Sequence, residues 1–300
     1  MIFDMTKRKN GGGIQPPTGT KMVAVTENGT VTENVADYAS VQIDTDVVGY
    51  KVYNDGATHL YISVNEVTRK LALQMAFYGS LDIDWGDGSA STLRGTNSTS
   101  TKRAVHEYAR DGFYHIRCTF TPAVSGSTCN FAKGTNFGSI IFSDVNGSSN
   151  SAYRSVLLAI ENGSPKTGFE NVFRYTYSLC YAHITDTSLG SSAFNGDYAL
   201  SKIDIPNIVT IGDSAFTNCT GLGSVVIPVS CTSIGSYAFS GCSSLREIHF
   251  KSSIPPTLSS SNVFTSLNTS CKIYVPTGSL AAYTTATNYP SSSNYTYEEE

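Results

Sequence analysis

A pattern that recurs every 21 to 25 residues in the C-terminal half constrains the fold of this chain more than any other feature. Each unit contains a phenylalanine and, nine and eleven residues later, a pair of mostly apolar residues; in four units a leucine stands six residues after the phenylalanine. The phenylalanines are Phe173, Phe194, Phe216, Phe239 and Phe264, and the leucines are Leu179, Leu200, Leu222 and Leu245. The pattern predicts a solenoid, because each stacked coil must present the same side chains to a shared core.

Two units between Ile211 and Phe250 share the form IG-x-x-AF-x-x-C-x-x-L-x-x-(I/V)-x-(I/F). This form resembles the BspA-type leucine-rich repeats of bacterial and phage surface proteins, and it implies a leucine-rich-repeat solenoid. The units around Phe173 and Phe264 are less regular, as terminal repeats are. We therefore expect residues 123–300 to form a leucine-rich-repeat solenoid with caps.

The seven cysteines are odd in number and include no CxxC pair, which excludes a complete disulfide framework and argues against a zinc knuckle. Cys219 and Cys242 occupy the same position in successive repeats. We interpret both as small buried hydrophobic residues. A disulfide between them stays open as the alternative, because stacked coils would bring them close together.

Residues 47–122 have the pattern of antiparallel β-strands, in which Leu81, Ile83 and Trp85 alternate with aspartates. The motifs are Trp85-Gly86-Asp87-Gly88-Ser89 and His106-Glu107-Tyr108, followed by Gly112-Phe113-Tyr114. They resemble the polycystic-kidney-disease (PKD) domain, an immunoglobulin-like β-sandwich. The resemblance implies a spacer or contact domain, with the single tryptophan, Trp85, on a buried strand face.

The first 46 residues divide into a polar arm, residues 1–20, and a short β-module, residues 21–46. The arm contains three glycines and two prolines and has no apolar periodicity, so we expect it to order only against another chain. The β-module contains Glu27-Asn28-Gly29-Thr30 and the run 38–43. It resembles a module found near the start of phage tail and fibre proteins. The complete fold class expected is mainly β: β-module, PKD/Ig-like sandwich, then solenoid.

Catalytic and metal-binding motifs were sought among the five histidines, which are His59, His106, His115, His183 and His249. They form no HxH or HExxH pattern, and the chain has no GxSxG, Walker or GxGxxG motif, so we expect no enzyme, cofactor or metal. Asp82, Asp84 and Asp87 do not have the spacing of an EF-hand loop. A weak calcium site near Asp84 and Asp87 stays open, with turn formation as the alternative.

Residues eight and ten positions after each phenylalanine should point outward from the parallel sheet of the solenoid. We predict that they bind a host glycan or protein, since aromatic and imidazole side chains are effective contact residues. The alternative is an ordinary solvated face. The predicted binding residues are Tyr181, His183, Lys202, Asp204, Glu247, His249, Lys272 and Tyr274.

These features predict a non-enzymatic phage virion protein, either a fibre or a capsid decoration, that docks through residues 1–46 and presents the solenoid outward. The first residues lack the apolar segment of an export signal, which favours the virion over the alternative, a BspA-type adhesin on the bacterial surface. A glycan-acting enzyme is a distant third possibility. The net charge of −4 without a basic stripe argues against nucleic-acid partners. No apolar run is long enough for membrane insertion, and we expect a homo-oligomer.

Overall fold

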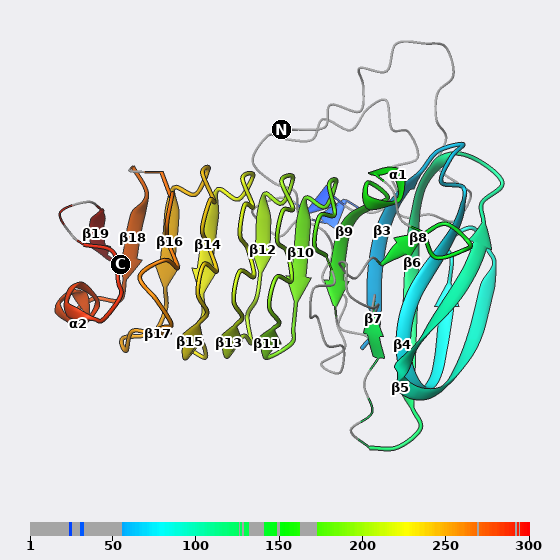
Figure 1. Ribbon diagram of the computed structural model, residues 1–300, viewed down its shortest axis with the longest axis horizontal. Helices are drawn as coiled ribbons and strands as arrows, with labels where there is room; N and C mark the ends of the chain where they lie inside the picture. The colour runs from blue at the N-terminus through cyan, green and yellow to red at the C-terminus, as the bar shows by residue number, and fades with distance from the viewer. Residues whose placement is uncertain are drawn as a thin grey trace, which may run out of the picture.

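The computed structural model describes the chain from residue 56 to its end with several gaps. The ranges are 56–125, 127, 129–131, 141–148, 151–162, 173–268, 270–291, 293 and 295–300, together with the backbones of β1 (Ala24–Val25) and β2 (Val31–Thr32). Strands β1 and β2 pair antiparallel. The predicted arm and the rest of the predicted β-module lie outside the described residues. Figure 1 shows a row of coils that ends in a β-rich region containing strands β3 to β8.

Two rows of parallel strands form two sides of the solenoid (Figure 1). The longer strands are β9 (Leu157–Asn162), β10 (Tyr181–Ile184), β12 (Lys202–Asp204), β14 (Ser224–Ile227), β16 (Glu247–Phe250), β18 (Lys272–Val275) and β19 (Thr296–Glu299). The shorter strands are β11 (Ser188–Leu189), β13 (Thr210–Ile211), β15 (Ser233–Ile234) and β17 (Thr257–Leu258). Since neighbouring strands in each row come from successive repeats, each repeat forms one coil.

The third side of the solenoid consists of turns around the repeated phenylalanines. The phenylalanine N–H donates to the carbonyl of the next coil, as from Phe216 to Ala238 at 2.7 Å. The residues two before and two after the phenylalanine adopt left-handed conformations, with φ between 57 and 78°. They are Ser192, Ser214 and Tyr237 before it, and Tyr175, Gly196, Asn218, Gly241 and Ser266 after it. The left-handed residues on both sides of the phenylalanine orient backbone N–H groups along the solenoid axis. The turns therefore form hydrogen bonds from coil to coil, as the strands do.

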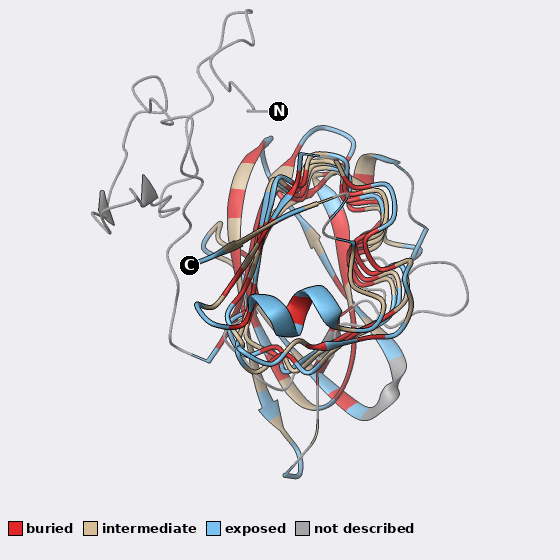
Figure 2. Ribbon diagram, turned by 90° about the vertical axis from the view of Figure 1, so that its left-hand side faces the viewer, coloured by how far each residue is buried: buried red, intermediate tan, exposed pale blue. Residues whose placement is uncertain are grey.

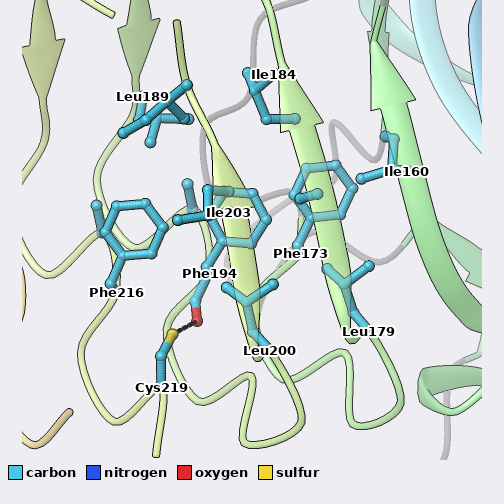
Figure 3. Close-up of a cluster of buried hydrophobic side chains, with 14 of the residues drawn as sticks. Ile160, Phe173, Leu179, Ile184, Leu189, Phe194, Leu200, Ile203, Phe216 and Cys219 are labelled. Atoms are coloured by element: carbon cyan, nitrogen blue, oxygen red, sulfur yellow. Dashed lines mark hydrogen bonds between the residues drawn. The ribbon is translucent and has the colours of Figure 1, made fainter. Parts of the chain in front are cut away.

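The repeated phenylalanines form a continuous stack of rings inside the solenoid, and Figure 3 shows Phe173, Phe194 and Phe216 of this stack. Successive ring centroids lie 5.0, 5.4, 5.1 and 5.7 Å apart, with interplanar angles of 20° or less. The predicted inward residues at nine and eleven positions after each phenylalanine are all buried, which confirms the periodicity. They are Ala182 and Ile184, Ile203 and Ile205, Val225 and Ile227, Ile248 and Phe250, and Ile273 and Val275.

The Ile-Gly pair of the repeat exists because the backbones of neighbouring coils come very close at this point. A Cβ atom on Gly235 would lie 2.4 Å from the backbone nitrogen of Asp213, and one on Gly212 would lie 2.7 Å from Gly190 C. Neither distance is sterically possible for a side chain. Glycine is therefore required at these positions because the coils are closely spaced, and not because the backbone adopts an unusual conformation.

Strand β3 (Thr58–Val64) joins the first coil to the N-terminal β-region. It pairs antiparallel with β9 on one side and with β6 (Gly112–Pro122) on the other. Strand β6 pairs with the second half of β4 (Lys70–Asp84), and β5 (Ala90–Glu107) pairs along the length of β4. One sheet with the order β12-β10-β9-β3-β6-β4-β5 therefore runs from the solenoid through the N-terminal region.

The division at residue 122 differs from the sequence prediction. Strands β7 (Cys129–Phe131) and β8 (Phe142–Ser143) pair with the first half of β4, although the prediction placed them in the solenoid. A short helix, α1 (Ser151–Arg154), follows them before β9 begins the coils. Backbone N–H and C=O groups in the first half of β4 need hydrogen-bond partners on the edge that does not pair with β5. Strands β7 and β8 provide these partners.

Trp85 is fully buried in the N-terminal region, as its alternation with aspartates predicts. Its indole Nε1 donates to Ser91 Oγ at 2.9 Å, and its ring stacks on His106 with centroids 4.6 Å apart. The Tyr108 hydroxyl donates to the Trp85 carbonyl at 3.0 Å. The apolar residues around Trp85 are continuous with the phenylalanine stack in one core.

Helix α2 (Leu280–Thr285) lies across the end of the solenoid, as Figure 2 shows. Its buried Tyr283 packs on Phe250 with ring centroids 5.0 Å apart, and the Tyr283 hydroxyl donates to the Ser252 carbonyl at 2.7 Å. Side chains from this helix therefore cover the last coil. Of the helices that the structure describes, none has the length and apolar character of a membrane span.

Substitution of the repeat glycine tests the close approach of the coils. Gly235→Ala should lower the free energy of unfolding by roughly 1–3 kcal/mol, because the new Cβ would force two backbones apart. Gly223→Ala is the matched control, since a Cβ there meets no atom within 4 Å, and it should change stability by less than about 0.5 kcal/mol. Urea denaturation of both variants measures the difference. Equal stabilities would contradict this packing.

Candidate functional site

The outer face of the last coils contains four of the predicted binding residues. In β16 and β18 the residues alternate between buried and accessible, so that Ile248 and Ile273 face the core. Glu247 pairs with Lys272, and His249 pairs with Tyr274, in the register of the two strands. Together with Glu298 and Glu300 these four residues are called the outer ladder below.

The His249 imidazole lies at the centre of the outer ladder. It stacks on Tyr274 with centroids 4.5 Å apart and planes 7° apart. Its Nδ1 lies 2.9 Å from Glu300 Oε2, and its Nε2 lies 3.4 Å from Glu247 Oε2. The stack and the two carboxylates fix the orientation of the ring, so this surface is ordered before any partner binds.

Two lysines, Lys272 of the outer ladder and the neighbouring Lys251, form ion pairs with its carboxylates. Lys251 bonds to Glu300, and Lys272 Nζ lies 2.8 Å from Glu298 Oε1. Burial alone would raise the pKa of Glu300, but the hydrogen bonds from Lys251 and His249 outweigh it and lower that pKa. The sequence prediction missed Glu298 and Glu300. The alternation of Tyr295 and Tyr297 with polar residues is the signal that could have identified β19.

Tyr181 and His183 are not on an exposed surface, contrary to the prediction. They are only 5% and 6% exposed. The sheet does not end at β10, since β9 and β3 continue it, and Tyr181 packs with Tyr61 and Ala159 on these strands. His183 Nδ1 lies 2.6 Å from Asp204 Oδ2.

The other two predicted binding residues lie on β12. Lys202 is exposed, and Asp204 is half-buried beside His183. The β14 residues at the same positions are Ser224 and Val226, both exposed. The predicted residues therefore form two separate groups, one on β16 and β18 and one on β10 and β12.

The aspartates around Trp85 take part in turn formation. Asp84 Oδ1 accepts the Gly86 N–H at 2.9 Å, and Asp87 Oδ1 accepts the Ser89 hydroxyl at 2.6 Å. Asp87 Oδ2 lies 2.8 Å from His106 Nε2. Burial would raise the pKa of Asp87, but the bonds from Ser89 and His106 lower it overall. Among the described residues, no group of three or more His, Cys, Asp or Glu side chains could hold a metal ion.

Cys219 and Cys242 are buried free thiols, as predicted, and all seven cysteines are free. Each Sγ lies 3.1 Å from a carbonyl of the preceding coil, Phe194 for Cys219 and Phe216 for Cys242. Figure 3 shows the first of these contacts. Burial raises the pKa of Cys242 to about 12. The thiols therefore bond between coils and have little thiolate character at neutral pH.

Asp197 occupies the repeat position of these cysteines and was missed in the sequence prediction. It is completely buried, and its Oδ1 accepts the Thr176 N–H of the preceding coil at 2.6 Å. Its Oδ2 has no hydrogen-bond partner in the described part of the chain. Burial raises the pKa of Asp197 well above its usual range, although the Thr176 bond and the Arg154 charge act in the opposite direction. The carboxyl therefore keeps its proton to higher pH than an exposed aspartate does.

Residues 167–286 match the family model described as "BspA type Leucine rich repeat region", in six copies. This segment is therefore similar to BspA-type leucine-rich repeats. The match does not extend to residues 1–46 or 47–122, so the phage-type and PKD-type resemblances stay predictions.

Among solved structures, the repeats are similar to a leucine-rich repeat protein from Bacteroides ovatus, with 22% identity and a TM-score of 0.39. That alignment covers 48% of this chain and 36% of the Bacteroides protein, so the chain spans about a third of its length. No curated protein matches the chain.

The buried carboxyl predicts a specific pH dependence of stability. Because the folded-state pKa of Asp197 is raised, the folded chain holds a proton that the unfolded chain releases above about pH 3.9, so Asp197 lowers stability as pH rises. Asp197→Asn keeps the acceptor for Thr176 N–H and removes this effect. Relative to the unsubstituted protein, the variant should gain stability progressively from pH 4 to pH 7 in urea denaturation.

Asp213→Asn is the matched control for this experiment. The Asp213 carboxylate also accepts an N–H of a neighbouring coil, from Ser236 at 2.7 Å, but it is exposed. The control should show no such pH-dependent gain. A stability difference for Asp197→Asn that is the same at every pH would contradict the raised pKa of Asp197.

Proposed function

We propose that this protein is a non-enzymatic, adhesin-like surface protein that binds its partner through the outer ladder of the last solenoid coils. The observation that carries the proposal is the outward stack of His249 on Tyr274, which lies on paired strands of a rigid sheet. BspA-type repeats in residues 167–286 support a surface protein, because the resemblance to bacterial and phage surface proteins rests on these repeats. The proposed partner is a host glycan or protein.

The chemistry of the outer ladder supports contact rather than catalysis. The imidazole and the phenol ring provide flat contact area that loses little side-chain entropy on binding. The charged groups around them pair with one another, as Lys272 does with Glu298. This leaves the His249–Tyr274 pair as the principal contact for a neutral sugar or a polar protein surface.

The phage virion role depends on residues 1–46, most of which lie outside the described residues, and none of the three comparisons supports it. The bacterial surface is therefore the location proposed here. Docking to virion proteins through residues 1–46, the PKD-type assignment and a homo-oligomeric state remain predictions.

Removal of the stacked pair tests the proposed function. The double variant His249→Ala/Tyr274→Ala should keep the melting temperature within a few degrees, because both side chains lie outside the core. It should lose at least tenfold in attachment to host epithelial cells, measured with the fluorescently labelled protein. The matched control is Ser224→Ala/Val226→Ala, which changes the equivalent positions on β14 and should attach normally.

Normal attachment of the folded His249→Ala/Tyr274→Ala protein would overturn the outer ladder as the binding surface. Failure of the unsubstituted protein to attach to any host cell would overturn the adhesin-like function itself. In that case, binding to purified bacteriophage particles through residues 1–46 would support the virion role.

A further inference from the structure

A second group of exposed aromatic side chains lies in the turns of the first coils, away from the outer ladder. It consists of the exposed Tyr177 and Tyr198, together with the half-buried Tyr175, Arg154 of α1 and Arg174. We call this group the tyrosine–arginine cluster. Tyr177 and Tyr198 are 39% and 50% exposed.

The coil geometry holds the tyrosine rings in fixed positions. Tyr177 and Tyr198 each stand four residues after a stacked phenylalanine, so their rings repeat with the coils, 6.3 Å apart and 9° from parallel. Tyr175 adopts the left-handed conformation with φ of 61°. Its ring covers Gly196 of the next coil, where a Cβ would lie 2.3 Å from Tyr175 Cδ1. The rings are therefore ordered without a ligand.

The two guanidinium groups lie beside the Tyr175 ring, and each has one hydrogen bond to a described residue. Arg174 Cζ is 4.9 Å and Arg154 Cζ is 5.7 Å from the Tyr175 ring centroid. Arg154 Nη1 donates to the Arg174 carbonyl at 3.1 Å, and Arg174 Nη2 donates to the Tyr175 hydroxyl at 3.3 Å. Arg174 Nε is buried and has no acceptor among the described residues.

The cluster has an uncompensated positive charge. In the described part of the chain, neither guanidinium forms an ion pair with a carboxylate. Two half-buried arginines without a carboxylate partner among the described residues offer donors to an anion.

We propose that the tyrosine–arginine cluster binds an acidic carbohydrate, such as a uronic-acid or sialic-acid-containing glycan. The guanidinium forks of Arg154 and Arg174 would bind the sugar carboxylate, because their planar donors match its two oxygens. The parallel rings of Tyr177 and Tyr198 would stack on the C–H faces of neighbouring sugar rings. Two flat platforms one coil apart suit a chain of rings better than an acidic peptide. This site is independent of the outer ladder, which lies on the sheet of the last coils.

Binding of defined acidic sugars to the full chain tests this proposal. Isothermal titration should detect at least one of oligogalacturonate, hyaluronan oligosaccharide and 3′-sialyllactose, with affinity that falls as salt is raised. Methyl-esterified oligogalacturonate and lactose are the matching neutral probes, and they should bind at least tenfold more weakly. Poly-glutamate tests the acidic-peptide alternative.

Two variants assign the binding to the cluster. Tyr198→Ala and Arg174→Gln should each weaken the acidic sugar at least tenfold without a change in thermal unfolding. The matched controls Tyr237→Ala and Arg246→Gln remove an exposed ring and an exposed guanidinium on other coils, and they should bind normally. Tyr198 is half exposed, so its variant stays informative if Arg174→Gln fails to fold.

The proposal is overturned if none of the three acidic sugars binds, or if Tyr198→Ala binds them as tightly as the unsubstituted protein. Equal affinity for the neutral probes would remove the role of the guanidinium groups. Tighter binding of poly-glutamate than of every acidic sugar would assign the cluster to acidic peptides instead. Loss of the outer-ladder function would leave all these outcomes unchanged.

Discussion

All three sides of the solenoid must advance by the same distance per coil. On two sides this distance is set by parallel strand pairing, which holds backbones about 4.8 Å apart. On the third side, N–H groups of the turns donate to the next coil, as from Phe216 to Ala238. Inside, phenylalanine rings stack at 5.0 to 5.7 Å. A coil with a different spacing on one side would lose strand pairing, turn hydrogen bonds or ring stacking with both neighbouring coils.

This single constraint explains several residues that would otherwise look unrelated. Gly235 lacks a side chain because the coil before it leaves no space for one. Cys242 fits where a thiol can bond to a carbonyl of the preceding coil. Tyr283 packs on Phe250 at one end of the solenoid, and β3 supplies hydrogen bonds to β9 at the other. Each end of the solenoid is therefore closed by elements that are not repeats themselves.

The sequence predicted the interior of the solenoid well because the periodic residues all face one shared core. Phe216, Ile227 and Cys219 lie where their repeat positions require. Buried Trp85 was equally predictable, because a strand with one apolar face must turn that face inward. In such cases a local pattern determines burial without knowledge of distant partners.

Prediction failed where burial depends on strands that are far apart in the sequence. Tyr181 and His183 stand at the repeat positions that were predicted to face outward. The sheet continues beyond them through β9 and β3, and the repeat pattern does not predict these strands. The burial of Asp197 was not predicted, because an aspartate in a coil normally indicates a solvated turn. Glu300 reaches His249 because the last strand, β19, returns to pair with β18. The candidate site was therefore only half predictable, since the outer ladder combines repeat residues with a nonrepeat strand.

The continuous sheet and core join the solenoid and the N-terminal region into one cooperative unit, and Trp85 reports on this directly as the only tryptophan. The decisive measurement is urea unfolding of Phe216→Ala, followed in parallel by Trp85 fluorescence and far-ultraviolet circular dichroism. Loss of the buried ring should cost about 3–5 kcal/mol and shift both transitions together. A Trp85 transition that stays at the midpoint of the unsubstituted protein, while the circular dichroism signal is lost earlier, would show two independent units and contradict the continuity of the fold.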